Sequence, residues 1–396
     1  MPAKRISGAS ARSRLGSYVT ISVVGEAVKA YIPVPLPPNP PVDLGRLHGR
    51  IERADHALGR LDGLSALVPD TNLLLYTYIR KEAVLSSQIE GTQSSLSELL
   101  LFENEAAPGV PVVDVEEVSN YVAAMQHGLR RLRGGFPLSL RLIREIHAIL
   151  LRGGRGSVKL RGEFRRSQNW IGGTRPGNAS FIPPPPNRLM ECLDPFEKFL
   201  HDESETLPLL VKLGLIHVQF ETIHPFLDGN GRVGRLLITL LLCEKKVLRE
   251  PLLYLSLFFK THRERYYELL QRIRTEGAWE DWLAFFLEGI ESTAGEVAKS
   301  VRRSLVQFAR DRKKIAGIGR AASSTLRIQE YLQKRPIANI RAISKTLGLS
   351  VPTVTGALQH LVDLGIAKEM TGARRNRLFS YPKYLAMVTS GTEPIR

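Results

Sequence analysis

Apolar residues recur at steps of three and four along most of the chain between residues 44 and 296, and this spacing constrains the fold more than any other feature. Such spacing gathers apolar side chains on one face of a helix, and neighbouring helices must cover that face. The chain is therefore expected to be mainly α-helical. The clearest faces belong to three segments: Val115, Val118, Val122, Met125, Leu129 and Leu132; Leu142, Ile146 and Ile149; Leu209, Leu213, Ile216, Phe220 and Ile223.

Polar residues and a proline mark where these helices begin and end. Asp114 and Glu117 form a capping-box pattern at the start of the first segment, and Ser139 is expected to cap the second. Pro225 must end the third, because proline has no N–H to donate inside a helix. The third helix therefore ends beside a glycine-rich stretch.

Residues 161–186 have a different pattern from the helices on either side of them. Gly172-Gly173 and Pro176-Gly177-Asn178 are turn signals, and they lie between the short segments 169–171 and 180–182. This order predicts a short β-hairpin inserted in a helical domain.

The composition divides the chain into four expected parts. Residues 1–43 combine a mobile arm, rich in Ser, Arg and Gly, with a proline-dense strap that cannot be helical. Residues 44–296 form the helical domain. Residues 297–324 combine a basic helix with a small-residue linker, and residues 325–396 form the last unit.

The net charge of +16 is concentrated in one part of the chain. Residues 301–396 hold 18 Lys and Arg against 5 Asp and Glu, whereas residues 1–300 hold 37 against 34. A nucleic-acid partner is therefore a question for the last quarter of the chain only.

Two further features indicate a cytoplasmic protein with no membrane partner. The chain has only two cysteines, Cys192 and Cys243, which excludes a disulfide framework. Its longest strongly apolar run, residues 236–243, is far shorter than the roughly 20 residues that span a bilayer.

Residues 224–235, HPFLDGNGRVGR, are the most informative stretch for function. Glycines tolerate positive φ and let backbone N–H groups converge on an anion where a helix begins. Two arginines three positions apart can grip phosphate oxygens from the first turn. The residues expected to surround a bound nucleotide are Gly229, Asn230, Gly231, Arg232, Val233, Gly234 and Arg235.

Asp228 and His224 add reactive groups to this stretch. Asp228 offers one hard oxygen ligand, which suits Mg²⁺ held mainly by phosphates and water. His224 can accept a proton near neutral pH. An EF-hand interpretation fails because its later ligand positions are missing. A lone histidine or an Asp-Gly-Asn-Gly turn is usually structural, but the combination predicts a nucleotide site.

Residues 224–235 resemble the complete signature of the Fic (filamentation induced by cAMP) family, H-x-F-x-[D/E]-G-N-G-R-x-x-R. The resemblance covers roughly residues 31–290 and includes Gly162-Glu163-Phe164-Arg165. It implies a Fic-type helical domain that transfers AMP from ATP, with Mg²⁺, to a Ser, Thr or Tyr hydroxyl of target proteins and of itself. His224 would be the base. The hairpin would be the family's target-docking flap, with these residues: Gly172, Gly173, Phe181 and Ile182.

Ser86-x-x-x-Glu90-Gly91 resembles the family's inhibitory helix, [S/T]-x-x-x-E-[G/N]. Without that context it is an ordinary helix end with Gly91 as the cap. The resemblance implies a brake in which the Glu90 carboxylate occupies the Arg235 guanidinium and misaligns ATP. In some relatives the same glutamate positions water for removal of AMP, so de-AMPylation stays open as an alternative.

Residues 325–396 resemble a winged helix-turn-helix domain. Helices are expected at 340–347 and 352–364, with a turn at Gly348 and an N-cap at Ser350, and strands at 367–370 and 378–381. The second helix carries no Lys or Arg, so a protein-interaction module stays open beside DNA binding. The residues that would contact DNA are Thr353, Thr355 and Gln359 on the helix and Arg374, Arg375 and Arg377 on the wing.

The nucleobase pocket, the assembly state and one rival function complete the expectations. Tyr254-Leu255-Ser256 and Tyr266-Tyr267 are candidates for the nucleobase by analogy with the family, and Tyr267 is the preferred one, since one of two adjacent tyrosines belongs to the core. The resemblance also implies a homodimer. The rival function is a DNA-binding regulator whose Fic domain only senses a nucleotide, a role that needs no base at His224.

Overall fold

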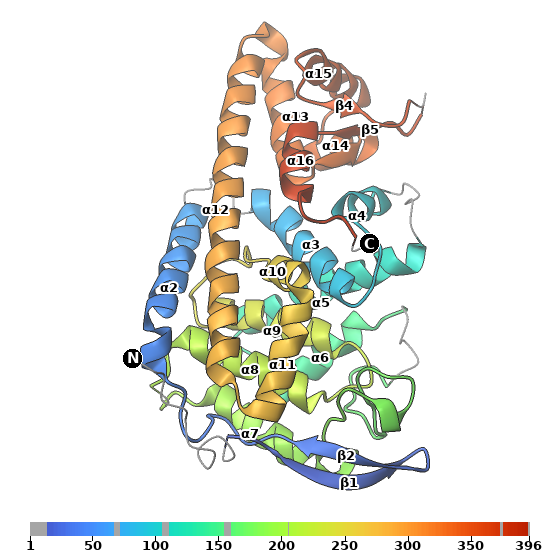
Figure 1. Ribbon diagram of the computed structural model, residues 1–396. Helices are drawn as coiled ribbons and strands as arrows, with labels where there is room; N and C mark the ends of the chain where they lie inside the picture. Colours follow the sequence, from blue (N-terminus) through green and yellow to red (C-terminus); the bar gives the residue numbers. More distant parts are fainter. Residues whose placement is uncertain are drawn as a thin grey trace. The chain divides into compact units, whose positions relative to one another are not determined.

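The computed structural model describes residues 14–66, 72–104, 111–153, 160–204, 206–372 and 375–394. Helices dominate these residues (Figure 1), as the apolar spacing predicts. They form two compact units. The first consists of the described residues of Met1–Leu58, Ala123–Val247 and Phe258–Ser292; the second consists of those of Gly59–Val122, Leu248–Leu257 and Thr293–Arg396.

In the first unit α8 (Leu209–Ile223) is buried on all sides, and α7, α9 and α11 pack against it. Trp282 donates its indole N–H to the Gly214 carbonyl at 2.9 Å. A Cβ on Gly214 would lie 2.7 Å from Leu283, so glycine lets these two helices approach closely. The helices that contribute to this unit are α2 (Leu44–Ala66), α5 (Val112–Arg133), α6 (Leu140–Leu150), α7 (Leu189–His201), α8 (Leu209–Ile223), α9 (Asn230–Glu244), α10 (Ser256–Thr261), α11 (Arg263–Glu276) and α12 (Trp279–Ala316).

The expected helix boundaries are right at two positions and wrong at one. Ser139 caps α6 by accepting the Leu142 N–H at 3.4 Å, and α8 ends immediately before His224-Pro225. The capping box at Asp114 is wrong, because α5 begins two residues earlier. Asp114 instead accepts the Gln93 N–H at 2.8 Å.

An antiparallel hairpin precedes the helices, formed by β1 (Ser17–Val23) and β2 (Glu26–Ile32), with Ser17 opposite Ile32. The expectation of a mobile arm is therefore wrong for these residues. Arg14 is also fixed, since its guanidinium pairs with Glu280 at 2.8 Å. The hairpin buries Val23, Val28 and Ala30 together with Ile182, far along the chain. This long-range contact explains why local composition misled the prediction.

The second unit joins the N-terminal helices to the C-terminal quarter. Its described elements include α3 (Asn72–Ile89), α4 (Leu96–Phe102), α13 (Ala322–Lys334), β3 (Ile337–Asn339), α14 (Ile340–Leu347), α15 (Val351–Asp363), β4 (Lys368–Glu369), β5 (Leu378–Ser380) and α16 (Pro382–Thr389). The three strands pair antiparallel in the order β3-β5-β4. The expected helices and both expected strands are present, whereas β3 and α16 were not predicted.

The linker of this unit differs from the expectation, whereas the turn between its two predicted helices agrees with it. The small-residue stretch after α12 is a tight turn with a short 3-10 helix at Gly319–Ala321, and α13 begins at Ala322. Gly348 adopts the left-handed conformation and Ser350 caps α15, as predicted. Arg374, predicted on the wing, lies outside the described residues.

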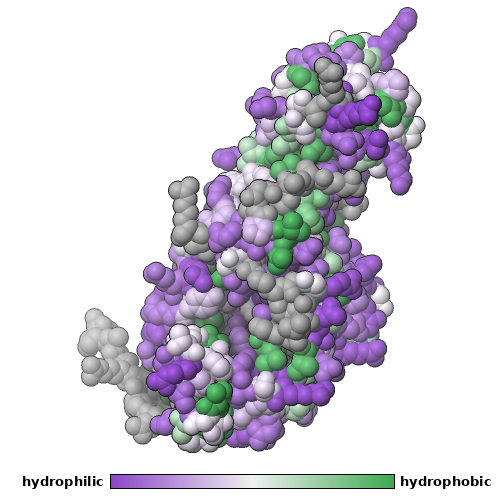
Figure 2. All heavy atoms as spheres, turned by 90° about the vertical axis from the view of Figure 1, so that its right-hand side faces the viewer, coloured by the Kyte–Doolittle hydropathy of each residue, from purple (hydrophilic) through white to green (hydrophobic). Residues whose placement is uncertain are grey.

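The helices of the described ranges do not meet the requirements for crossing a membrane. None of their helices combines the length and apolar character that crossing a bilayer requires. On the face drawn in Figure 2, hydrophilic residues predominate and hydrophobic residues gather in small separate groups.

Candidate active site

His224 occupies a strained position at the end of α8. Its backbone is left-handed (φ 51°, ψ 59°), a conformation that residues other than glycine rarely adopt and that is often found at functional sites. Its N–H donates to the Phe220 carbonyl at 2.9 Å, and its own carbonyl accepts Nε of Arg165 at 2.9 Å. Helix and arginine together hold the conformation that presents the imidazole.

The loop after His224 is shaped by the side chain of Asn230. Its amide group pairs with both the N–H and the carbonyl of Phe226 at 2.8 Å, as a backbone segment would. Asn169 donates to the same carbonyl at 3.0 Å. Because the Asn230 side chain is committed to the loop, its backbone N–H is the group suited to phosphate.

The N-terminus of α9 has the backbone geometry on which the predicted anion cradle depends. Gly229 caps the helix with φ 78°, and the first intrahelical bond runs from the Val233 N–H to the Gly229 carbonyl at 3.0 Å. The N–H groups of the preceding first-turn residues have no partner within a helix of this kind. They point, with the positive end of the helix dipole, toward the place where an anion would bind.

The charged residues around this cradle are tightly packed. Arg232 and Arg235 are 4% and 2% exposed, so their charges lie in a medium where a phosphate would interact strongly with them. Asp228 accepts the Gly229 N–H at 2.6 Å, and Arg232 lies 3.4 Å from the same carboxylate oxygen. Gly234 allows α9 to pack against α8, since a Cβ there would lie 3.2 Å from Phe220.

Two tyrosines on α11 divide as predicted into a core residue and a surface residue. Tyr266 is 1% exposed and bonds through its hydroxyl to His217 at 2.9 Å, whereas Tyr267 is 40% exposed. His217 also contacts the Gly234 carbonyl at 3.1 Å, and burial lowers the pKa of His217 to about 3. The core pair thus supports the helix that carries the arginines, and Tyr267 stays the nucleobase prediction.

The predicted hairpin flap is present in a compact form. Ile171 and Phe181 form an antiparallel bridge, and Gly172 and Gly173 have φ near 70° as the turn requires. Phe181 lies under the Arg274 guanidinium, 3.8 Å from the ring centroid. The Ile182 carbonyl accepts the Tyr31 N–H from β2 at 2.9 Å. Phe181 and Ile182, predicted to dock a target, are therefore buried anchors of the flap.

Ser86 and Glu90, the predicted brake residues, belong to the second unit. Ser86 is fully buried in the last turn of α3, and Glu90 directly follows the helix. The Gly91 N–H donates to the Gln88 carbonyl at 3.0 Å with φ 99°, as its expected capping role requires. Ser256, near the other nucleobase candidates, instead binds the Glu82 carboxylate.

His147 and Arg165 support this site, and neither was predicted from the sequence to do so. His147 contacts the Asp228 carbonyl at 3.0 Å, and burial lowers its pKa to about 4. Arg165 was noted only within a motif, yet it donates to the backbone of His224 and Pro184 and is 2% exposed. For His147 the signal in the sequence was a polar residue on the buried face of a helix, and for Arg165 it was the motif at residues 162–165.

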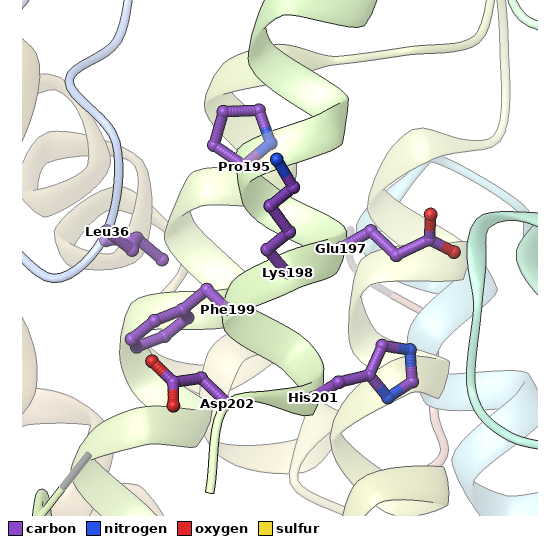
Figure 3. Close-up of a pocket in the computed structure, with 7 residues that line it drawn as sticks. All are labelled: Leu36, Pro195, Glu197, Lys198, Phe199, His201 and Asp202. Carbon is purple, nitrogen blue, oxygen red and sulfur yellow. The ribbon is translucent and has the colours of Figure 1, made fainter. Parts of the chain in front are cut away.

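An open pocket of about 700 Å³ lies elsewhere in the first unit (Figure 3). Leu36 of the proline-rich strap faces α7 across it, and no predicted site residue lines it. Its other lining residues are Pro195, Glu197, Lys198, Phe199, His201 and Asp202. Within the described ranges, no group of three or more His, Cys, Asp or Glu side chains could hold a metal ion by itself.

The structure thus places a left-handed histidine beside a glycine-capped helix that carries two buried arginines. Residues 48–130 match the Fic/DOC family N-terminal model, and residues 137–242 match the Fic/DOC family model. Both Fic/DOC models therefore match the central part of this chain, where the signature lies.

Named relatives are similar to this chain in sequence, and one solved structure is similar to it in fold. The chain is similar to Protein adenylyltransferase Fic of Aedes aegypti, with 33% identity over 254 residues, 62% of this chain and 46% of that protein. Its Drosophila melanogaster counterpart is 30% identical over 252 residues, 62% and 47% of the two chains. The match therefore spans about half the length of these relatives. A Fic family protein from Desulfovibrio desulfuricans shares the fold, with a TM-score of 0.56, 19% identity and coverage of 86% and 97%.

Proposed function

We propose that this protein is an adenylyltransferase that transfers AMP from ATP to a hydroxyl side chain of a target protein and of itself. The observation that carries the proposal is the juxtaposition of His224, held left-handed by Arg165, with the N-terminus of α9 and its buried arginines. The relatives named protein adenylyltransferase support transfer over nucleotide sensing or AMP removal.

The residues divide the reaction between a base and a cradle. His224 removes the hydroxyl proton while the oxygen forms a bond to the α-phosphorus, and the bond from that phosphorus to pyrophosphate breaks. The α9 amides and Arg232 stabilise the charge on the phosphoryl oxygens, and Arg235 holds the outer phosphates. Tyr267 on α11 is the side chain we assign to the nucleobase.

Mg²⁺ fits this donor set as a partner of the nucleotide. Asp228 is the one carboxylate in the loop, and the described residues contain no cluster that would hold a metal ion alone. That is the arrangement Mg²⁺ favours, with one or two carboxylates, phosphates and water. When bound, the ion would neutralise phosphate charge.

The test is incubation with α-labelled ATP and Mg²⁺. Wild type is expected to label itself or proteins of a lysate, and His224→Ala to lose the label by at least ~10²-fold because no other group replaces the base. His48→Ala is a matched control, since the His48 side chain is 74% exposed and belongs to a helix surface. Near-normal labelling by His224→Ala would refute the mechanism.

We further propose that Glu90 restrains this activity through Arg235. The end of α3 at Ile89, followed by the left-handed Gly91, supports this, because it leaves Glu90 at a helix end rather than within a packed turn. A carboxylate on the guanidinium would compete with the outer phosphates for the same donors. ATP would then bind with its α-phosphorus displaced from the attacking hydroxyl.

The C-terminal elements support a winged helix-turn-helix assignment, which we also propose. The order α13-β3-α14-α15-β4-β5 is that of such domains, and Thr353 and Gln359 on α15 are exposed. Arg375 is exposed after β4. Contact with DNA phosphates would give a gel shift of the full chain that weakens steeply between 50 and 200 mM salt, and absence of that shift favours a protein partner.

A homodimer and a cytoplasmic location are the remaining proposals. Cys192 and Cys243 are not joined by a disulfide, which agrees with a reducing compartment. A monomer mass in sedimentation equilibrium would contradict the first proposal, and recovery outside the cytosolic fraction would contradict the second.

A further inference from the structure

His147 on α6 links two segments that flank the proposed reaction site. Its side chain is fully buried. Nδ1 accepts the Gly162 N–H at 2.9 Å, and Nε2 lies 3.0 Å from the Asp228 carbonyl. Its ring stacks on Phe226 with centroids 3.7 Å apart and planes 8° apart.

These contacts fix which nitrogen carries the proton. Nδ1 accepts a hydrogen bond and therefore has no hydrogen, so Nε2 must carry one and donate it to the Asp228 carbonyl. Only the neutral Nε2–H tautomer satisfies both partners. The ring therefore acts as a fixed spacer with a donor on one side and an acceptor on the other.

Through Nε2, His147 holds the peptide group between Asp228 and Gly229, which precedes the first amides of α9. Asp228 and Gly229 share the peptide group whose carbonyl His147 holds, and the Gly229 N–H turns back to the Asp228 carboxylate at 2.6 Å. Gly229 in turn caps α9. Rotation of this peptide would move the proposed metal ligand and the first helix amides together.

The acceptor side of His147 controls the segment that holds the base. Gly162 is left-handed, and its carbonyl accepts Nε of Arg144 at 2.7 Å, so it is fixed from both sides. Three residues later, Arg165 donates its N–H to the Pro225 carbonyl and its Nε to the His224 carbonyl, both at 2.9 Å. The position of this segment therefore reaches the backbone of His224.

We propose that His147 is a positioning residue that sets the distance between the His224 base and the α9 amides without touching the substrate. The proposal rests on the proposed adenylyl transfer. A displacement of about 1 Å between reacting groups can lower a rate ~10²-fold while the substrate still binds. Loss of the bond to Asp228 should therefore lower the rate at saturating ATP more than it changes the ATP concentration for half the maximal rate.

Three substitutions separate the contributions of the ring. His147→Phe keeps the stack on Phe226 and removes both hydrogen bonds. His147→Gln returns a donor near the Nε2 position, and His147→Asn returns an acceptor near the Nδ1 position. His48→Phe is the matched control, because it makes the same exchange at a histidine whose side chain is 74% exposed, and it should leave the rate unchanged.

The experiment measures self-labelling and pyrophosphate release against ATP concentration, together with amide resonances of Gly229 and Asn230 in ¹⁵N-labelled full chain. His147→Phe should lower the saturating rate ~10- to 10²-fold, change the half-saturating ATP concentration less than ~3-fold and shift both resonances. His147→Gln should recover most of the rate and His147→Asn should not. If His147→Phe does not fold, the comparison of Gln with Asn decides the question.

Several outcomes would overturn the proposal. These are an unchanged rate in His147→Phe, equal losses in Phe and Gln, or a loss confined to ATP affinity. If wild type transfers no AMP, the proposed function is wrong. The amide resonances of Gly229 and Asn230 then test by themselves whether His147 positions the loop. Unshifted Gly229 and Asn230 amides in His147→Phe would then overturn it.

Discussion

The loop of the first unit and the helix α3 of the second are stabilised in different ways. Many of the loop's bonds join residues four positions apart, as between Asn230 and Phe226 or Val233 and Gly229. The bonds of α3 to the C-terminal segment join residues more than 300 positions apart. They run from Lys81 to the Ser390 carbonyl at 2.7 Å, from Gln88 to the Thr392 carbonyl at 2.8 Å, and between Thr77 and Tyr384 at 3.0 Å.

The candidate catalytic loop therefore combines local bonds with bonds from Arg165, Asn169 and His147 of its own unit, whereas α3 depends on the end of the chain. Lys81 and Gln88 are buried where the C-terminal segment lies on the helix. A substitution in residues 382–392 should therefore destabilise α3, which carries Ser86, more than it destabilises the loop.

The largest expected effect follows from removing the Tyr384 ring. Tyr384 is fully buried, packs edge-on against Phe308 at 5.0 Å and bonds to Thr77. Tyr384→Ala should cost about 3–5 kcal/mol of the stability of the second unit because it leaves a cavity. Hydrogen exchange should accelerate in α3 and α13 and stay slow in α8 and α9.

Tyr384→Phe is the control for this prediction. It keeps the ring and loses only the bonds of the hydroxyl, so its cost should be about 1 kcal/mol. Equal acceleration in both units after Tyr384→Ala would contradict this prediction, since it would mean that the two units unfold together.

The next effect concerns whether α3 restrains the loop. Glu90→Gly should raise labelling from α-labelled ATP by about 10²-fold, because release of Arg235 lets the α-phosphorus align with the attacking hydroxyl. The initial rate of self-labelling measures it. Glu203→Gly serves as the control, since the Glu203 side chain is 86% exposed in the first unit. Equal rates in wild type and Glu90→Gly would mean that the proposed brake does not act.

The same comparison explains what the sequence could predict. Helix ends at Ser139, Pro225, Gly348 and Ser350 were predictable because capping and proline effects operate within a few residues. Signature spacing identified the loop for the same reason. A capping pattern at Asp114 failed because its carboxylate serves Gln93 from another segment.

Features that depend on distant partners were missed. Alternation at Val19, Ile21 and Val23 is a strand signal, but only the contact with Ile182 makes that hairpin a part of the core. His147 is on a helical face that looks merely buried, and its two partners lie 15 and 81 residues away. No local rule could bring these groups together.

The smallest expected effect is a pH dependence in the free energy of unfolding of the first unit. Burial lowers the pKa of His217 to about 3, whereas an unfolded histidine has a pKa of about 6.5. Below pH 6.5 the unfolded chain binds a proton that the folded chain refuses, so the free energy of unfolding falls as pH falls. This histidine should account for a loss of about 2 kcal/mol at pH 5. His217→Asn keeps a donor for the Gly234 carbonyl but does not titrate. Urea unfolding of the first unit at pH 7 and 5 should therefore show a smaller loss in the variant, and equal losses would mean that His217 is not the group responsible.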